Sequence, residues 1–282
     1  MNSSDTVLRH LIEAELGVIC QRCGEDGRPA RVTEGVLSEV ESFCQECMDM
    51  GVADAGDVVY RWEEQSEEAL GPPMALQPTL RPLIIAGTPD APHTLDIFLD
   101  YVCPFSAKLA RAINTVLVPA LGPGGKYHGT VKAIFRPQVQ PWHASSTFVH
   151  EAGLAVARVS PESFWPFSLA LFEHQAEYFD IPTSTLTPIQ IRAKLAALAG
   201  EVVPAGAGGN TAGAFADLLV LKGTPNGGVD VTDDLKYTIK FSRQNGIHVS
   251  PTLLWDGLIA NEISSSWGEK EWTEFLAAKV VV

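Results

Sequence analysis

The sequence predicts an α/β protein, and three observations support this class. Residues 93–102 contain alternating apolar positions, as a largely buried strand does, and an amphipathic helical pattern follows directly. A second apolar strand lies near residues 131–136, so that strand, helix and strand follow in order. The rest is mostly helical until a strand–turn–strand and a last helix. We therefore expect a parallel βαβ unit, an inserted helical block at about 145–228, and a closing segment of sheet and helix.

Local signals predict where several of these elements begin and end. Thr187 is an expected helix cap, and Gly200 an expected stop for the same helix. The dipeptide Asp256–Gly257 between two apolar runs predicts a type I′ hairpin turn. Ser266 and Glu269 have the spacing of a capping box at the start of the final helix.

Charge divides the chain into two unlike parts. Residues 1–73 hold 16 of the 34 acidic but only 5 of the 20 basic side chains. A stretch rich in charge and then in proline ends this part, so we expect domains at 1–73 and 74–282. The net charge of −14 argues against nucleic-acid binding, which needs basic side chains. We find neither an apolar run long enough for a membrane span nor a secretory signal, and expect a cytoplasmic location.

Four of the five cysteines lie in the acidic part, in two CxxC pairs about twenty residues apart. This spacing is typical of a small module that holds a structural zinc ion through four thiolates, here Cys20, Cys23, Cys44 and Cys47. Such a module is more often a docking element for a protein partner than an enzyme. Two alternatives stay open: cysteines buried on an amphipathic helix, and a redox role for either pair.

The remaining cysteine, Cys103, lies where the first strand ends and the helix begins, in the stretch "DYVCPFS". Pro104 suits the first turn of that helix, because its missing amide hydrogen would be unpaired there. Unpaired amides and the helix dipole favour a negative charge at this position, so the thiol is expected to ionise more readily than a free cysteine. The alternative is an inert buried cysteine.

The motifs "DYVCPFS" and "GIHVSPTLLWDG", with the order of elements, resemble the DsbA-like thioredoxin-fold family, which includes the kappa-class glutathione transferases. The resemblance covers about residues 80–281. It implies that Pro251 is cis and lies beside the active-site sulfur, and that the backbone of Ser250 pairs with a substrate thiol's backbone. Pro104 and Phe105 belong to the same thiol-binding region.

The chain departs from both branches of that family. Dithiol oxidases have a second cysteine where this chain has Ser106, and kappa-class relatives have serine where it has Cys103. We therefore expect a monothiol oxidoreductase with Cys103 as nucleophile, Ser106 hydrogen bonding to the thiolate, and glutathione or another thiol-bearing partner completing the exchange. The alternatives are a glutathione transferase or isomerase-like enzyme, and a non-catalytic thioredoxin-fold binding module.

Several nearby residues have less certain roles. Asp100 is either a buried proton acceptor near the thiol or an ordinary capping aspartate. His143 and His248 are placed close to the same region by the order of elements, but structural or surface roles are the more frequent outcome for such residues. Trp142 and Trp165 are expected to pack in the core or helical block.

Overall fold

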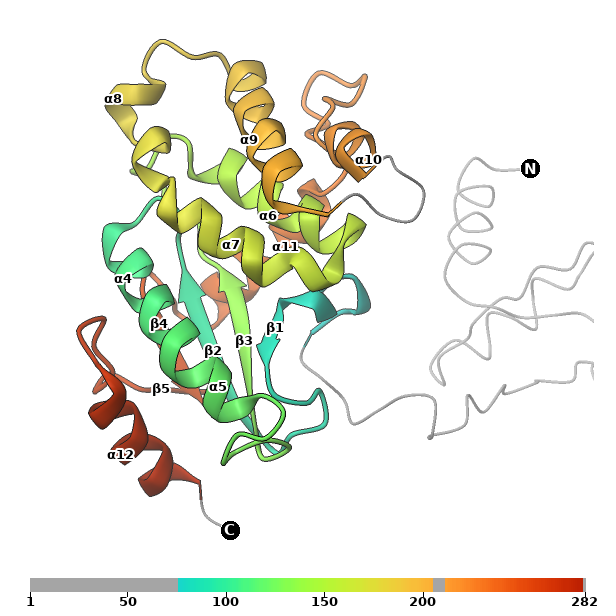
Figure 1. Ribbon diagram of the computed structural model, residues 1–282. Coiled ribbons are helices and arrows are strands. Elements are labelled where there is room, and N and C mark those ends of the chain that lie inside the picture. Colours follow the sequence, from blue (N-terminus) through green and yellow to red (C-terminus); the bar gives the residue numbers. More distant parts are fainter. Residues whose placement is uncertain (1–75, 205–210, 281–282) are drawn as a thin grey trace, which may run out of the picture. The chain divides into compact units, whose positions relative to one another are not determined.

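The structure, a computed structural model, describes residues 76–204 and 211–280 of the chain. In this part, five strands form one sheet in the order β1-β3-β2-β4-β5 (Figure 1). They are β1 (Ile84–Ala86), β2 (His93–Leu99), β3 (Val131–Pro137), β4 (Thr252–Trp255) and β5 (Leu258–Ile259). The predicted domain 1–73 and its four cysteines lie outside the described residues.

The βαβ unit predicted from the sequence is confirmed. Strands β2 and β3 are parallel and pair from His93↔Val131 to Leu99↔Pro137. Their connection is a helix in three segments: α4 (Pro104–Ala112), a π-helical turn (Ile113–Leu117) and α5 (Val118–Leu121). The remaining pairs are antiparallel. Strand β1 was not predicted.

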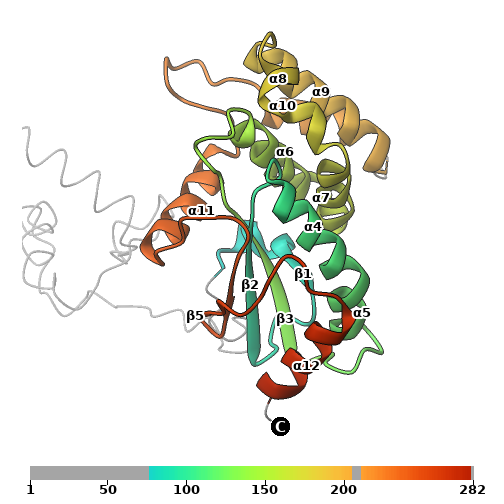
Figure 2. The ribbon, with the colours of Figure 1, turned by 90° about the vertical axis from the view of Figure 1, so that its left-hand side faces the viewer.

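Helices cover both faces of the sheet and its end. On one face lie α4, α5 and α12 (Glu269–Lys279), and on the other lies α11 (Thr232–Gln244) (Figure 2). The helical block lies beyond the carboxyl ends of β2 and β3 (Figures 1 and 2). It comprises α6 (Ser146–Val159), α7 (Phe164–Glu173), α8 (Asp180–Thr183), α9 (Pro188–Val202) and α10 (Thr211–Leu218). Short 3-10 turns stand at Pro78–Leu83, Pro161–Ser163 and Gln175–Tyr178. No helix in the described ranges is long and apolar enough to cross a membrane.

The two faces of β2 enter two apolar clusters because successive side chains in a strand point to opposite sides. Leu95, Ile97 and Leu99 are fully buried in the main core. Phe98 belongs to the smaller cluster beneath α11, where it stacks on Phe241. Burying each of these side chains is worth about 1.5–3 kcal/mol, so β2 is held firmly beneath the loop that follows it.

Two of the predicted local signals are confirmed. The Thr187 hydroxyl accepts a hydrogen bond from Gln190 N, and the Gln190 side chain accepts one from Thr187 N, so the cap of α9 is present. Asp256 and Gly257 both have positive φ, 48° and 84°, as a type I′ turn requires.

Two other local predictions are wrong. Helix α9 runs through Gly200 to Val202, since a glycine late in a helix does not end it when packing continues on either side. Helix α12 begins at Glu269, and its start is stabilised by Gly268 N donating to the Glu271 carboxylate. Ser266 is bonded to Ser264 instead of serving as the cap.

Candidate active site

Cys103 is the first residue of the candidate site, and it lies at the junction of β2 and α4. It has an extended backbone (φ −83°, ψ 120°), is the N-cap of α4, and is 6% exposed. Its own N–H donates to Asp100 O at 3.0 Å, which closes the turn after β2. The side chain of Cys103 makes no cap bond at this helix start, so it does not occupy the unpaired first-turn amides.

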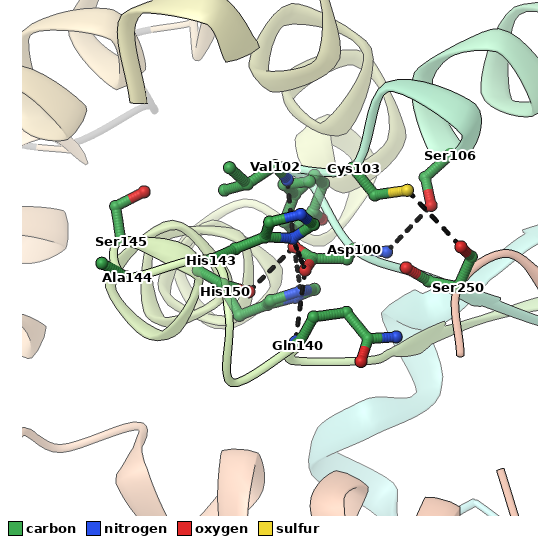
Figure 3. Close-up of polar contacts among 12 residues, drawn as sticks. Asp100, Val102, Cys103, Ser106, Gln140, His143, Ala144, Ser145, His150 and Ser250 are labelled. Carbon is green, nitrogen blue, oxygen red and sulfur yellow. Dashed lines mark hydrogen bonds and ion pairs between the residues drawn. The ribbon is translucent and has the colours of Figure 1, made fainter. Parts of the chain in front are cut away.

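The segment before β4 meets the thiol from the far end of the chain. The peptide bond between Ser250 and Pro251 is cis, the form that the family resemblance implies. The Cys103 Sγ–H donates to Ser250 O at 3.4 Å (Figure 3). The two sequence motifs, 147 residues apart, are thus in direct contact.

Ser106, one turn into α4, is fully buried and is the last residue of the segment 100–106, which we call the thiol loop. Its Oγ accepts a hydrogen bond from Asp100 N at 3.2 Å (Figure 3). A serine hydroxyl that accepts one bond still has its hydrogen to donate. The predicted hydrogen bond from Ser106 to an ionised sulfur therefore stays a prediction.

Asp100 is a fully buried carboxylate at the centre of the site. It accepts hydrogen bonds from a set of neighbours that come from the thiol loop, the segment after β3 and helix α6. They are Val102 N (2.9 Å), Gln140 N (3.2 Å), Ser146 Oγ (2.8 Å) and His143 Nδ1 (2.7 Å) (Figure 3). His150 Nε2 lies 3.5 Å from Asp100 Oδ1, the oxygen that also accepts from Val102 N and Ser146 Oγ. Asp100 is therefore a buried anchor.

The electrostatics of Asp100 decide its protonation state. Burial acts to raise the pKa of Asp100, but interactions with His150, His143 and the Val102 N–H outweigh burial and bring the pKa down to about 2. A carboxylate this acidic stays ionised near neutral pH and is a poor proton acceptor. Of the two roles considered from the sequence, its hydrogen bonds favour the structural one.

Two histidines lie close to Asp100, and the sequence analysis had considered only one of them. His143, considered as a rim residue, binds Asp100 and has a side chain that is 20% exposed. His150 is buried within α6, and its ring lies 4.7 Å from that of Tyr101. The sequence analysis missed His150, because nothing in an apolar helical run indicates that its histidine packs against the Asp100 carboxylate. His248 is exposed, as expected.

Two buried glutamines after β3 hold the segment that precedes Pro251. Gln138 Nε2 donates to Ile247 O at 3.5 Å. The Gln140 amide finds partners only when its oxygen and nitrogen exchange the positions drawn in Figure 3. In that orientation the nitrogen donates to His248 O (3.2 Å) and the oxygen accepts from Ser250 N (2.8 Å). Sequence reasoning missed both glutamines, since only the tertiary fold brings residues 138–140 against 247–250.

A third glutamine ties the thiol loop to the helical block. Gln175, in the turn between α7 and α8, donates to Tyr101 O at 2.9 Å and to Cys103 O at 3.3 Å. The loop's carbonyl groups are thereby satisfied by a side chain some seventy residues away. This contact also had no signal in the sequence.

Apolar side chains next to the site are exposed. Phe105 is 64% exposed and Val249 is 56% exposed, one on each of the two contacting segments. Trp142, expected to pack in the core, is 59% exposed, so that prediction is wrong. Trp165 is buried as expected. Within the described ranges, no group of three or more His, Cys, Asp or Glu side chains is arranged to hold a metal ion.

Comparisons with known proteins agree with this architecture. No family model and no curated protein matches the chain. Among solved structures, a candidate protein-disulfide isomerase from Pseudomonas syringae is 28% identical, covering 66% of this chain and 94% of its own, with a TM-score of 0.52. Oxidised BdbD from Bacillus subtilis is 19% identical, over 73% and 96%, with a TM-score of 0.49. The thiol-disulfide exchange protein α-DsbA2 from Wolbachia pipientis is 16% identical, over 68% and 84%, with a TM-score of 0.46.

The similarity to the Pseudomonas structure extends over nearly all of that protein. The described part of this chain accordingly has a thioredoxin-like fold of the DsbA type, as the two motifs predicted. The Pseudomonas structure, with which the fold is shared, is described as a candidate protein-disulfide isomerase.

Proposed function

We propose that this protein is a thiol–disulfide oxidoreductase that works through one thiol, that of Cys103. The observation that carries the proposal is the contact of this sulfur, at the N-cap of α4, with Ser250 O. A helix N-terminus stabilises the anion of a thiol, and a disulfide would have to reach Cys103 through the 6% of the residue that is exposed. The exposed Phe105 and Val249 beside it offer apolar surface to a substrate.

The reaction would proceed in two exchanges. The Cys103 thiolate attacks one sulfur of a disulfide R–S–S–R′, forming Cys103–S–S–R and releasing R′S⁻. A second thiol, glutathione or a partner's cysteine, then attacks this mixed disulfide, takes R as a new disulfide and restores the Cys103 thiolate. The proposal assigns the second step to an external thiol because position 106 is serine and Cys103 is the one cysteine in the described ranges. In this proposal the Ser106 hydroxyl, whose oxygen accepts from Asp100 N, would donate its hydrogen to the thiolate between the two steps.

The test is glutathionylation of Cys103. Oxidised glutathione should add one glutathionyl group at this residue, located by peptide mapping because four other cysteines are present, and reduced glutathione should remove it. Iodoacetamide should label Cys103 at pH 7 faster than it labels a free-cysteine peptide. An unreactive Cys103 would exclude the mechanism.

Two variants separate this proposal from its alternatives. Ser106→Cys should let the mixed disulfide resolve internally, without added thiol. Glutathione conjugation to an electrophile that survives Cys103→Ala would favour the transferase reading. If cells that carry Cys103→Ala behave like cells that carry the natural protein, the result favours a non-catalytic thioredoxin-fold binding module.

We also propose that the N-terminal cysteines bind one structural zinc ion, on the strength of their spacing alone. The residues are Cys20, Cys23, Cys44 and Cys47, which lie outside the described part of the chain. Elemental analysis of the purified protein should find zinc that is lost in Cys20→Ser. Unchanged zinc in that variant, or none in the natural chain, would contradict the site.

A further inference from the structure

The side-chain amide of Gln140 occupies backbone groups that border the reactive thiol. Gln140 is 1% exposed, and its own backbone N–H is fixed by Asp100. Its amide oxygen accepts from Ser250 N at 2.8 Å and lies 3.3 Å from Ser250 Oγ, while its nitrogen donates to His248 O at 3.2 Å. One side chain therefore satisfies a donor and an acceptor of the segment before Pro251.

These are the groups that an added strand would use. A residue placed in a parallel strand beside Val249 would donate its N–H to the carbonyl of residue 248 and accept the N–H of residue 250. An antiparallel strand opposite Ser250 would also need the Ser250 N–H. In either direction, an extended substrate competes with Gln140 for that hydrogen. The Gln140 amide, with one donor and one acceptor face, takes the place of a substrate peptide group.

Ser250 offers its carbonyl differently. Ser250 O accepts from the Cys103 thiol, and this bond ends as soon as the sulfur enters a mixed disulfide. Its N–H, by contrast, is bonded to a side chain that takes no part in the exchange. A disulfide bound at Cys103 therefore finds the Ser250 carbonyl without its thiol partner, while the Ser250 N–H is already bonded to Gln140.

We propose that Gln140 is a specificity-determining residue that lowers the reactivity of Cys103 toward disulfides recognised through a peptide backbone. The site then favours small disulfides that need no backbone pairing. It still reacts with glutathione or a peptide, but their backbone does not pair with both the N–H and the carbonyl of Ser250. This inference rests on the proposed function, because it concerns which disulfides Cys103 attacks.

The test compares two probes on the full chain. Oxidised glutathione carries a peptide backbone, and bis(2-hydroxyethyl) disulfide carries none, while both form a mixed disulfide with Cys103 and release one thiolate. In Gln140→Ala the rate with glutathione, divided by the rate with the second probe, should rise about 2- to 10-fold, the range expected for one hydrogen bond regained. Charges on glutathione are the same for every variant and cancel in this comparison.

Gln138→Ala is the matched control. It removes a neighbouring buried amide that holds Ile247 O without touching Ser250, so the rate ratio should stay at the natural value. If Gln140→Ala changes both rates by the same factor, the residue only holds the loop and the specificity role is overturned. If neither probe labels Cys103 of the natural protein, the proposed function itself fails and this inference falls with it.

A measurement on the natural protein guards against misfolding of the variant. The Ser250 amide hydrogen should exchange slowly with solvent in the free protein, because Gln140 binds it, and glutathionylation of Cys103 should not change that rate. An amide that exchanges freely and becomes protected only after glutathionylation would show that the substrate pairs there, which would overturn the proposal.

Discussion

The two segments that meet at the thiol are held in place by different means. The thiol loop at 100–106 is closed by three bonds of its own, from Cys103 N to Asp100 O, from Val102 N to the Asp100 carboxylate, and from Asp100 N to Ser106 Oγ. Side chains of other elements bind the loop that these bonds close. The segment at 247–250 receives its support from outside, from the amides of Gln138 and Gln140 and from the thiol.

This difference shows how the site divides its tasks. A loop closed by local bonds keeps the sulfur at the helix N-cap whatever is bound. When the sulfur reacts, the segment at 247–250 loses the bond from the thiol to Ser250 O and keeps the bonds from the two glutamine amides. Asp100 links the two regions, because it also binds Gln140 N.

The largest effect is expected from Asp100→Ala, which removes the link between the two segments. The change leaves the buried Val102 and Gln140 N–H groups without their acceptor, so it should lower the free energy of unfolding by about 3–5 kcal/mol. Urea denaturation at pH 7 measures this loss of stability. The rate at which Cys103 is alkylated under native conditions should differ from that of the natural protein as well.

Asp234→Ala is the control for that variant. Asp234, in the first turn of α11, is also buried, and it accepts bonds from Gln77, Thr79 and Arg158. It should lose stability without any change in the native alkylation rate of Cys103. Equal effects of the two variants on alkylation would mean that Asp100 has no special connection with the thiol.

Acid should weaken the same link in the natural protein. The pKa of Asp100 is about 2 in the folded chain against 3.8 for the free group. Because the folded value is the lower one, the stabilisation is complete above about pH 4 and is lost as the pH falls toward 2, and its full size is about 2 kcal/mol. The measurement is the urea midpoint at pH 5 and at pH 2.5, in the natural chain and in Asp100→Asn.

Other carboxyl groups also titrate in this range, so we compare the free energy of unfolding of the natural chain with that of Asp100→Asn at each pH. Asp100→Asn should be the less stable protein at pH 5, and the difference in the free energy of unfolding should narrow by about 1.5 kcal/mol at pH 2.5. A gap that stays constant with pH would contradict the low pKa of Asp100.

The same contrast between local and distant support explains what the sequence could predict. The position of Cys103 at a helix start followed from Pro104 and the change of apolar period, both of them local. The meeting of this residue with Ser250 came from the family resemblance. Gln140, Gln175 and His150 carried no signal, because a polar residue's burial and partner depend on how separate elements pack. Trp142 was misplaced for the same reason.

The smallest effect is expected where the thiol loop is tied to the helical block. Gln175→Ala removes the donors to Tyr101 O and Cys103 O, and water can replace part of them because Gln175 is only half-buried. The free energy of unfolding should fall by about 0.5–1.5 kcal/mol, with faster alkylation of Cys103 as the loop loosens. His174→Ala, which breaks an exposed contact with Glu177 next door, should leave both quantities close to natural values. If His174→Ala loosens the thiol as much as Gln175→Ala does, the turn as a whole, and not the Gln175 amide, supports the loop.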